Sequence, residues 1–139
     1  MPIFDASSVQ ATLRRLRGRA AQVLEGQTVL DLTLYELGNI VWKENRAHGG
    51  DPLQAAEKAK AVSRLISIMQ VRRIEPGEMP GIAENASRLG LTFYDSAYLT
   101  AAHESGAHLV TDDADILRAA QEAGVQASPT DSHLKSLEG

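Results

Sequence analysis

Near its N-terminus the chain reads Pro2-Ile3-Phe4-Asp5-Ala6-Ser7-Ser8, a short apolar run that ends at an acidic residue. A similar stretch, His108-Leu109-Val110-Thr111-Asp112-Asp113, lies toward the other end of the chain. Each apolar run predicts a strand. Because helical patterns separate the strands, we expect parallel pairing through crossover helices and therefore an α/β layered fold. The carboxyl ends of parallel strands meet at one sheet edge, so Asp5, Asp112 and Asp113 should emerge close together.

The rest of the chain continues this alternation without an internal repeat or a linker-like segment, which predicts a single domain over residues 1–139. From about residue 128 the sequence is polar and predicts a tail. Further strands are expected at 28–30, 71–75 and 125–127, and helices at about 8–25, 33–49, 52–69, 81–89, 92–105 and 114–123.

Composition excludes several classes of protein. The 139 residues are 43% hydrophobic, which is too apolar for a disordered chain. No apolar run approaches the ~20 residues of a membrane span, and no secretory pattern opens the chain, so we expect a cytoplasmic protein. The absence of cysteine excludes disulfides and thiolate chemistry. The net charge of −4 argues against bulk electrostatic binding of nucleic acid, which would then need local basic patches or metal ions.

Two further carboxylates share a local signature. The segments Thr33-Leu34-Tyr35-Glu36 and Thr92-Phe93-Tyr94-Asp95 both have the Ser/Thr-x-x-acid spacing of a capping box. Glu36 and Asp95 can therefore be simple helix caps. They can also be site residues, because the positive field at a helix N-terminus favours an ionised carboxylate.

Taken together, Asp5, Glu36, Asp95 and Asp113 suggest a shared site, since no lysine or arginine lies within three residues of any of them. Carboxylates gathered without a basic partner repel one another. A hard divalent cation such as Mg²⁺, or Mn²⁺ with the same ligand preference, would remove that cost. The four histidines are scattered along the chain, so a zinc site is not expected.

Other residues have two interpretations. The basic cluster of Arg14, Arg15, Arg17 and Arg19 fits either contact with RNA phosphates or a solvated helix face. Trp42 and Tyr98 fit base stacking or core packing, and core packing is the favoured interpretation.

Four ordered motifs resemble those of PIN-domain proteins, in particular the VapC toxins of toxin–antitoxin pairs. The resemblance runs from the first strand to about residue 127. It implies a three-layer α/β/α domain with a parallel five-stranded sheet in the order 3-2-1-4-5, a homodimer, a cognate antitoxin partner and Mg²⁺- or Mn²⁺-dependent ribonuclease activity. The motifs are Ile3-Phe4-Asp5-Ala6-Ser7, Leu32-Thr33-Leu34-Tyr35-Glu36-Leu37-Gly38-Asn39, Leu91-Thr92-Phe93-Tyr94-Asp95-Ser96-Ala97-Tyr98-Leu99 and Leu109-Val110-Thr111-Asp112-Asp113.

The resemblance also assigns roles. It places the family's catalytic and metal-binding acids at Asp5, Glu36, Asp95 and Asp113, with Asp112 as the second choice for the fourth acid. Supporting positions fall on Ser7, Asn39, Thr111 and Asp112, and Arg14, Arg15 and Arg17 are candidate RNA contacts.

Three other functions compete with this assignment. A phosphoacceptor receiver domain shares the acidic strand ends, but it needs a lysine after the last strand, where this chain reads Val125-Gln126-Ala127-Ser128-Pro129. A binding module would use the acids only as helix caps. A nuclease of RNA maturation would keep the chemistry and have no antitoxin.

Overall fold

Five short parallel strands form the central sheet of this computed structural model, which describes residues 1–138. They are β1 (Ile3–Phe4), β2 (Thr28–Leu30), β3 (Gln70–Arg72), β4 (Leu109–Val110) and β5 (Ala127–Ser128). Their order is β3-β2-β1-β4-β5, and every neighbouring pair is parallel, which confirms the expected topology. The predicted domain end at Gly139 lies outside the described residues.

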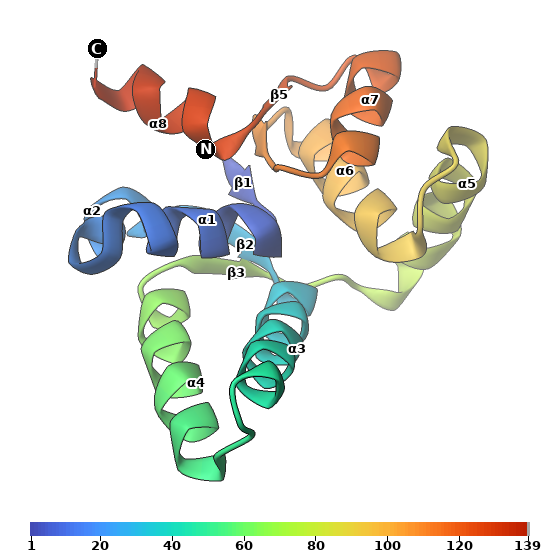
Figure 1. Cartoon of the computed structure of the whole chain (residues 1–139). Coiled ribbons are helices and arrows are strands. Elements are labelled where there is room, and N and C mark those ends of the chain that lie inside the picture. Colours follow the sequence, from blue (N-terminus) through green and yellow to red (C-terminus); the bar gives the residue numbers. More distant parts are fainter. Residues whose placement is uncertain (139) are drawn as a thin grey trace.

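Helices cover both faces of the sheet (Figure 1). In Figure 1 the helices between residues 6 and 67 gather on one side and those between residues 79 and 123 on the other. Short 3₁₀ turns occupy Arg17–Arg19 and Pro76–Glu78. The α-helices are α1 (Ala6–Leu16), α2 (Ala20–Leu24), α3 (Asp31–Ala47), α4 (Pro52–Ser67), α5 (Met79–Leu89), α6 (Phe93–Ser105), α7 (Ala114–Ala123) and α8 (Thr130–Glu138).

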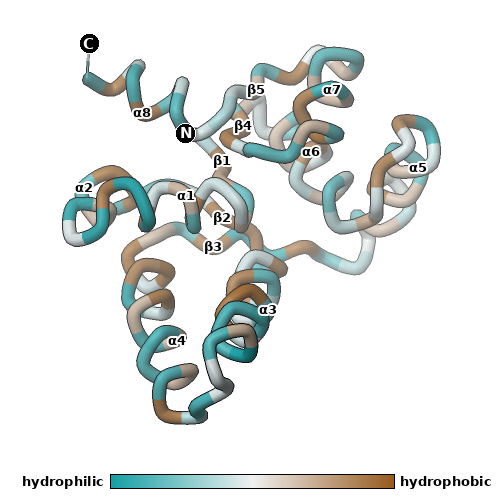
Figure 2. The backbone as a smooth tube through the Cα atoms, viewed as in Figure 1, coloured by the Kyte–Doolittle hydropathy of each residue, from teal (hydrophilic) through white to brown (hydrophobic). Residues whose placement is uncertain are grey.

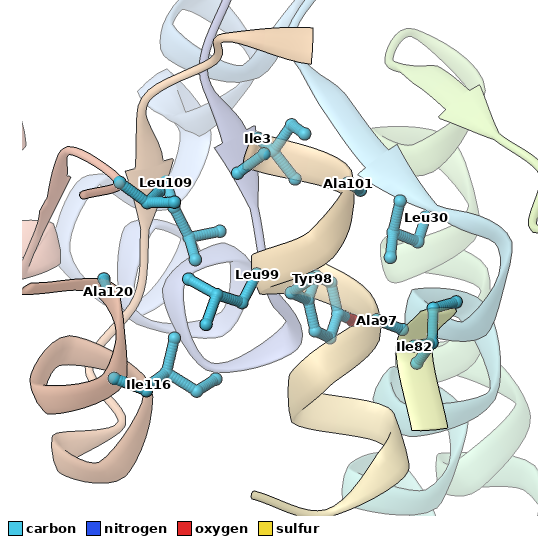
Figure 3. Close-up of a cluster of buried hydrophobic side chains, with 13 residues drawn as sticks. Ile3, Leu30, Ile82, Ala97, Tyr98, Leu99, Ala101, Leu109, Ile116 and Ala120 are labelled. Carbon is cyan, nitrogen blue, oxygen red and sulfur yellow. The ribbon is translucent and has the colours of Figure 1, made fainter. Parts of the chain in front are cut away.

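Alternation along the strands divides the core into two halves, because successive strand residues point to opposite faces. Ile3, Leu30 and Leu109 belong to the cluster that packs under α5, α6 and α7 (Figure 3). Their neighbours Phe4, Val29 and Val110 belong to the cluster under α1 to α4. Strands of two or three residues are therefore long enough to anchor both helical layers.

The single helix expected over residues 8–25 is wrong. It divides at Arg17, whose φ of +48° is rare for a residue with a side chain. The chain then makes a 3₁₀ turn and begins α2 at Ala20. This change of direction brings Ala20 and Leu24, both fully buried, into the core beneath the sheet.

Two predicted strands are shifted by contacts that local sequence does not reveal. Instead of 71–75 the strand covers 70–72, because the backbone N–H of Ile74 leaves the ladder and donates to Asp31 Oδ2 at 3.3 Å. Instead of 125–127 the last strand covers 127–128. Val125 does not join the sheet because it closes the C-terminus of α7. Gly124, the C-cap residue, has a positive φ, and the Val125 N–H donates to the carbonyl of Ala120 at 2.9 Å.

The polar tail that begins at about residue 128 forms the end of β5 and the helix α8. Leu134 is buried, and the ring of His133 meets Phe4 edge-on with 5.4 Å between ring centroids. Asp131 also forms an ion pair with Arg15 of α1. Such a helix is hard to predict from a polar sequence, because one buried apolar side chain and a few polar contacts are enough to hold α8 against the rest of the domain.

Helix α4 buries side chains toward its C-terminal end, at Leu65 and Ile66, whereas Ala59 is exposed. Hydrophilic and hydrophobic residues alternate along α3 and α4 (Figure 2). Trp42 of α3 is 54% exposed, so its expected place in the core is wrong. None of the helices within residues 1–138 is both long and apolar enough to cross a membrane.

Candidate active site

A cavity of about 280 Å³ lies at the carboxyl ends of β1 and β4. The chain order of the strands reverses there, since β2 and β4 flank β1 on opposite sides, and ligands of open α/β sheets bind at such points. The structure therefore brings together the four predicted acids and two of the supporting residues. The lining residues are Asp5, Ala6, Ser7, Glu36, Asn39, Ile40, Asp95, Tyr98 and Asp113.

Asp5 follows β1 and is also the N-cap of α1. Its Oδ1 accepts the backbone N–H of Ser8 at 2.9 Å and the hydroxyl of Ser7 at 2.8 Å, and its Oδ2 accepts the hydroxyl of Thr111. The side chain is almost fully buried, at 4% exposure. Burial raises the pKa of the Asp5 carboxyl above its ordinary value, although these hydrogen bonds act in the opposite direction. Ser7 and Thr111, the expected supporting residues, both donate to this carboxylate, and their role in the reaction stays a prediction.

Glu36 lies in the second turn of α3, so it is not the acid of a capping box. The helix begins at Asp31, and the Thr33 hydroxyl accepts the backbone N–H of Leu30 at 3.1 Å. Glu36 instead accepts a hydrogen bond from the Tyr98 hydroxyl at 2.5 Å. Burial, together with the charges of Asp5 and Asp95, raises the pKa of the Glu36 carboxyl, while the Tyr98 hydrogen bond opposes the rise.

Asp95 forms half of the expected capping motif. Thr92 is the N-cap of α6, and its hydroxyl accepts the backbone N–H of Asp95 at 3.1 Å. Burial raises the pKa of the Asp95 carboxyl, and the neighbouring charge of Asp113 raises it further, while the interaction with Thr92 opposes the rise.

The structure separates the roles of Asp112 and Asp113. Asp113 lines the cavity, and its Oδ1 caps α7 by accepting the N–H groups of Asp115 and Ile116 at 2.9 and 3.0 Å. Asp112 turns toward the start of α8, where its two oxygens accept the N–H and the hydroxyl of Thr130, each at 2.8 Å. Asp113 is therefore the better placed candidate for the fourth acid.

The donor chemistry of the cavity fits a hard divalent cation. Among residues 1–138, no positively charged residue lines the cavity. The pKa values of Asp5, Glu36 and Asp95 are all raised. Carboxylate oxygens are the ligands that Mg²⁺ and Mn²⁺ prefer. In the described part of the chain, no three acidic or histidine side chains are already arranged as the ligands of one ion.

The predicted RNA-contacting arginines lie outside the cavity. Arg14 forms an ion pair with Glu44 of α3, and Arg15 forms one with Asp131 of α8. Arg17 lies at the break after α1. Their contact with RNA stays a prediction.

Sequence reasoning did not assign Tyr98 to the acidic site, although Tyr98 lines the cavity. Tyr98 is buried, as the core-packing interpretation expects, but its hydroxyl reaches Glu36 and the hydroxyl of Thr33. The available signal is its spacing: Tyr98 lies three residues after Asp95, and therefore on the same face of α6.

Comparisons with known proteins agree with this architecture. The PIN domain family matches residues 3–122. Exonuclease VapC9 of Pyrobaculum aerophilum is 36% identical over 93 residues, which cover 67% of this chain and 66% of that protein, just under two thirds of its length. The crystal structure of PAE2754 from Pyrobaculum aerophilum is similar with a TM-score of 0.82 and 28% identity, over 99% of this chain and 94% of that one. This chain belongs to the PIN domain family and is VapC-like.

Proposed function

We propose that this protein is a metal-dependent ribonuclease that hydrolyses RNA phosphodiester bonds, and that it is the toxin of a VapBC-type pair. One observation carries the proposal: carboxylates from four segments far apart in sequence line one cavity at the point where the strand order reverses. Membership of the PIN domain family supports it, as does a relative named as an exonuclease and a VapC protein.

In this mechanism the four acids divide the work. Asp5 and Asp95 are the principal metal ligands, while Glu36 and Asp113 serve as further ligands or orient the attacking water. Bound Mg²⁺ or Mn²⁺ would lower the pKa of that water and offset the charge of the phosphate. The Oδ1 caps fix the rotamers of Asp5 and Asp113, leaving Oδ2 of each carboxylate with lone pairs for the site.

Metal binding is the first test. Calorimetry with Mn²⁺ should show uptake by the wild type and a loss of at least about tenfold in affinity for Asp95→Asn. Asp51→Asn is the matched control, because Asp51 caps α4 at the Leu53 N–H and does not line the cavity. If the acids were helix caps and nothing more, as in a binding module, the wild type would take up no ion.

Cleavage is the second test, and we expect endonucleolytic attack. A circular RNA and its linear form should both be cut in Mg²⁺ or Mn²⁺, whereas an exonuclease needs a free end and would spare the circle. Asp95→Asn, purified in parallel, should abolish cleavage with the fold intact and so control for contaminating nuclease. Full metal-dependent activity in that variant would contradict the assignment.

The antitoxin and the homodimer are separate parts of the proposal. An apolar groove between α1, α3 and α4 supports docking of an antitoxin segment, with Leu13, Leu37 and Val62 among its walls. A small upstream reading frame for a DNA-binding protein, whose product copurifies and suppresses cleavage, would support the toxin role. Growth unaffected by expression of the active enzyme would favour the RNA-maturation alternative.

The homodimer has its own test. Light scattering of the isolated protein should give twice the chain mass of 15.0 kDa.

A further inference from the structure

Tyr98 connects the two helical layers directly behind the acidic cavity. It is 1% exposed and belongs to the core cluster on the α5–α7 side, together with Ile82 and Leu99 (Figure 3). Its hydroxyl nevertheless reaches α3, where it lies 2.5 Å from Glu36 Oε1 and 2.7 Å from Thr33 Oγ1. The Tyr98 hydroxyl on α6 therefore restricts the orientation of the Glu36 carboxylate on α3.

The hydrogen bonds around Tyr98 allow one consistent direction. An ionised Glu36 can accept a hydrogen bond and cannot donate one, so Tyr98 donates its single O–H to Oε1. Thr33 Oγ1 accepts the N–H of Leu30 at 3.1 Å and has its own O–H left to give to Tyr98. A series of hydrogen bonds therefore runs from the backbone at the end of β2, through the hydroxyls of Thr33 and Tyr98, to the Glu36 carboxylate.

We propose that Tyr98 is a positioning residue for the reaction: it holds one oxygen of Glu36 so that the other faces the cavity. Within residues 1–138 Tyr98 is the one hydrogen-bond partner of the Glu36 carboxylate, which forms no ion pair there. Hydrogen bonds to a charged acceptor are the strong ones. The inference rests on the proposed function, since Glu36 acts there as a ligand or as the group that orients water.

Tyr98→Phe removes the hydroxyl and keeps the buried ring, so it tests the role with little change in packing. We expect kcat to fall by roughly 10- to 100-fold and Mn²⁺ affinity to weaken by a similar factor, with KM for RNA unchanged. Tyr35→Phe is the matched control: Tyr35 precedes Glu36 and is 81% exposed, so its variant should behave as the wild type. Equal losses in both variants would overturn the proposal.

A double-mutant cycle separates positioning from a general structural role. If Tyr98 acts through Glu36, then Tyr98→Phe should have no additional effect on Mn²⁺ affinity in a Glu36→Gln background. Thr33→Ser, which keeps a hydroxyl, should retain activity, whereas Thr33→Val should lose part of it. Additive losses in the cycle would contradict the proposal.

A crystal structure of Tyr98→Phe without metal gives a readout independent of activity. Glu36 should leave the rotamer that it has in the wild type, and an unchanged Glu36 would overturn the positioning role even if the wild type is an active nuclease. A wild type that neither binds Mn²⁺ nor cleaves RNA would instead remove the proposed function, while the orientation of Glu36 would still report on Tyr98.

Discussion

Asp5 has two roles, and its two oxygens make them compatible. Oδ1 caps α1 and accepts the Ser7 hydroxyl, while Oδ2 accepts one hydroxyl, from Thr111, and keeps a lone pair free. Asp113 likewise uses its Oδ1 as a helix cap, at the start of α7. Asp5 and Asp113 are thus helix caps, as the alternative interpretation of the acids expects, and these caps hold candidate ligands in fixed orientations.

Asp95 should cost the protein stability at neutral pH. Its pKa is raised on folding, so the native state holds its proton more tightly than the unfolded chain does. The free energy of unfolding therefore falls as the pH rises from the unfolded pKa, near 3.9, through the folded value, and the loss is complete above both.

We therefore predict that Asp95→Asn, without metal, is more stable than the wild type at pH 7 by about 0.5–1 kcal/mol. The difference should shrink as the pH falls and vanish once Asp95 is protonated in both states. Urea unfolding from pH 3.5 to 8 measures it. A variant less stable than the wild type at pH 7 would show that the Asp95 charge stabilises the fold.

Substitutions of the neighbours Asp112 and Asp113 should affect different properties, the free energy of unfolding and the Mn²⁺ affinity respectively. Asp113→Asn keeps a cap oxygen and loses the charge, so Mn²⁺ affinity should fall at least about tenfold with the fold unchanged. Asp112→Ala removes both bonds to Thr130 and should lower the free energy of unfolding by about 1–2 kcal/mol, with Mn²⁺ affinity nearly unchanged. Calorimetry and urea unfolding of both proteins test this, and the reverse pattern would make Asp112 the fourth acid.

Among the elements, the break between α1 and α2 shows how tertiary contacts override a local preference. The helical pattern continues through Arg17, yet the chain turns there so that α2 can bury Ala20 and Leu24 under the sheet. The cost is a positive φ at a residue with a Cβ atom.

Glycine at this position should relieve that cost. We expect Arg17→Gly to raise the melting temperature, with a gain of up to about 1 kcal/mol, because glycine adopts positive φ freely. Arg19→Gly is the control: its φ of −92° needs no glycine, so the same substitution should destabilise by about 0.5–1 kcal/mol. Equal effects of the two variants on thermal unfolding would mean that Arg17 carries no strain.

At the scale of the whole molecule, the reversal of strand order assembles the cavity from both helical layers. Asp5 and Asp113 come from the ends of β1 and β4, whereas Glu36 comes from α3 on one side of the sheet and Asp95 from α6 on the other. Like charges are thus held together by a core that packs independently of them. Any cation that relieves their repulsion will bind the folded state in preference to the unfolded chain.

Metal should therefore stabilise the whole fold. At a free Mn²⁺ concentration of 100 times the Kd, we expect about 2.7 kcal/mol of additional stability. Thermal unfolding of the wild type should shift upward with Mn²⁺ and return with EDTA, while Asp95→Asn should shift much less. A shift of the same size in both proteins would place the ion at another site.

The sequence by itself determined the strand and helix types, the strand order through the resemblance, and the acids at the strand ends. The element types and the positions of the acids follow from local periodicity and from the chemistry of short motifs, which involve residues close together along the chain. The strand order follows from the resemblance alone. Only the tertiary structure decided the break at Arg17, the formation of helix α8, the orientation of Asp112 away from the cavity and the contact of Tyr98 with Glu36. Each depends on contacts between segments distant along the chain, where burial and hydrogen-bond partners outweigh local preference.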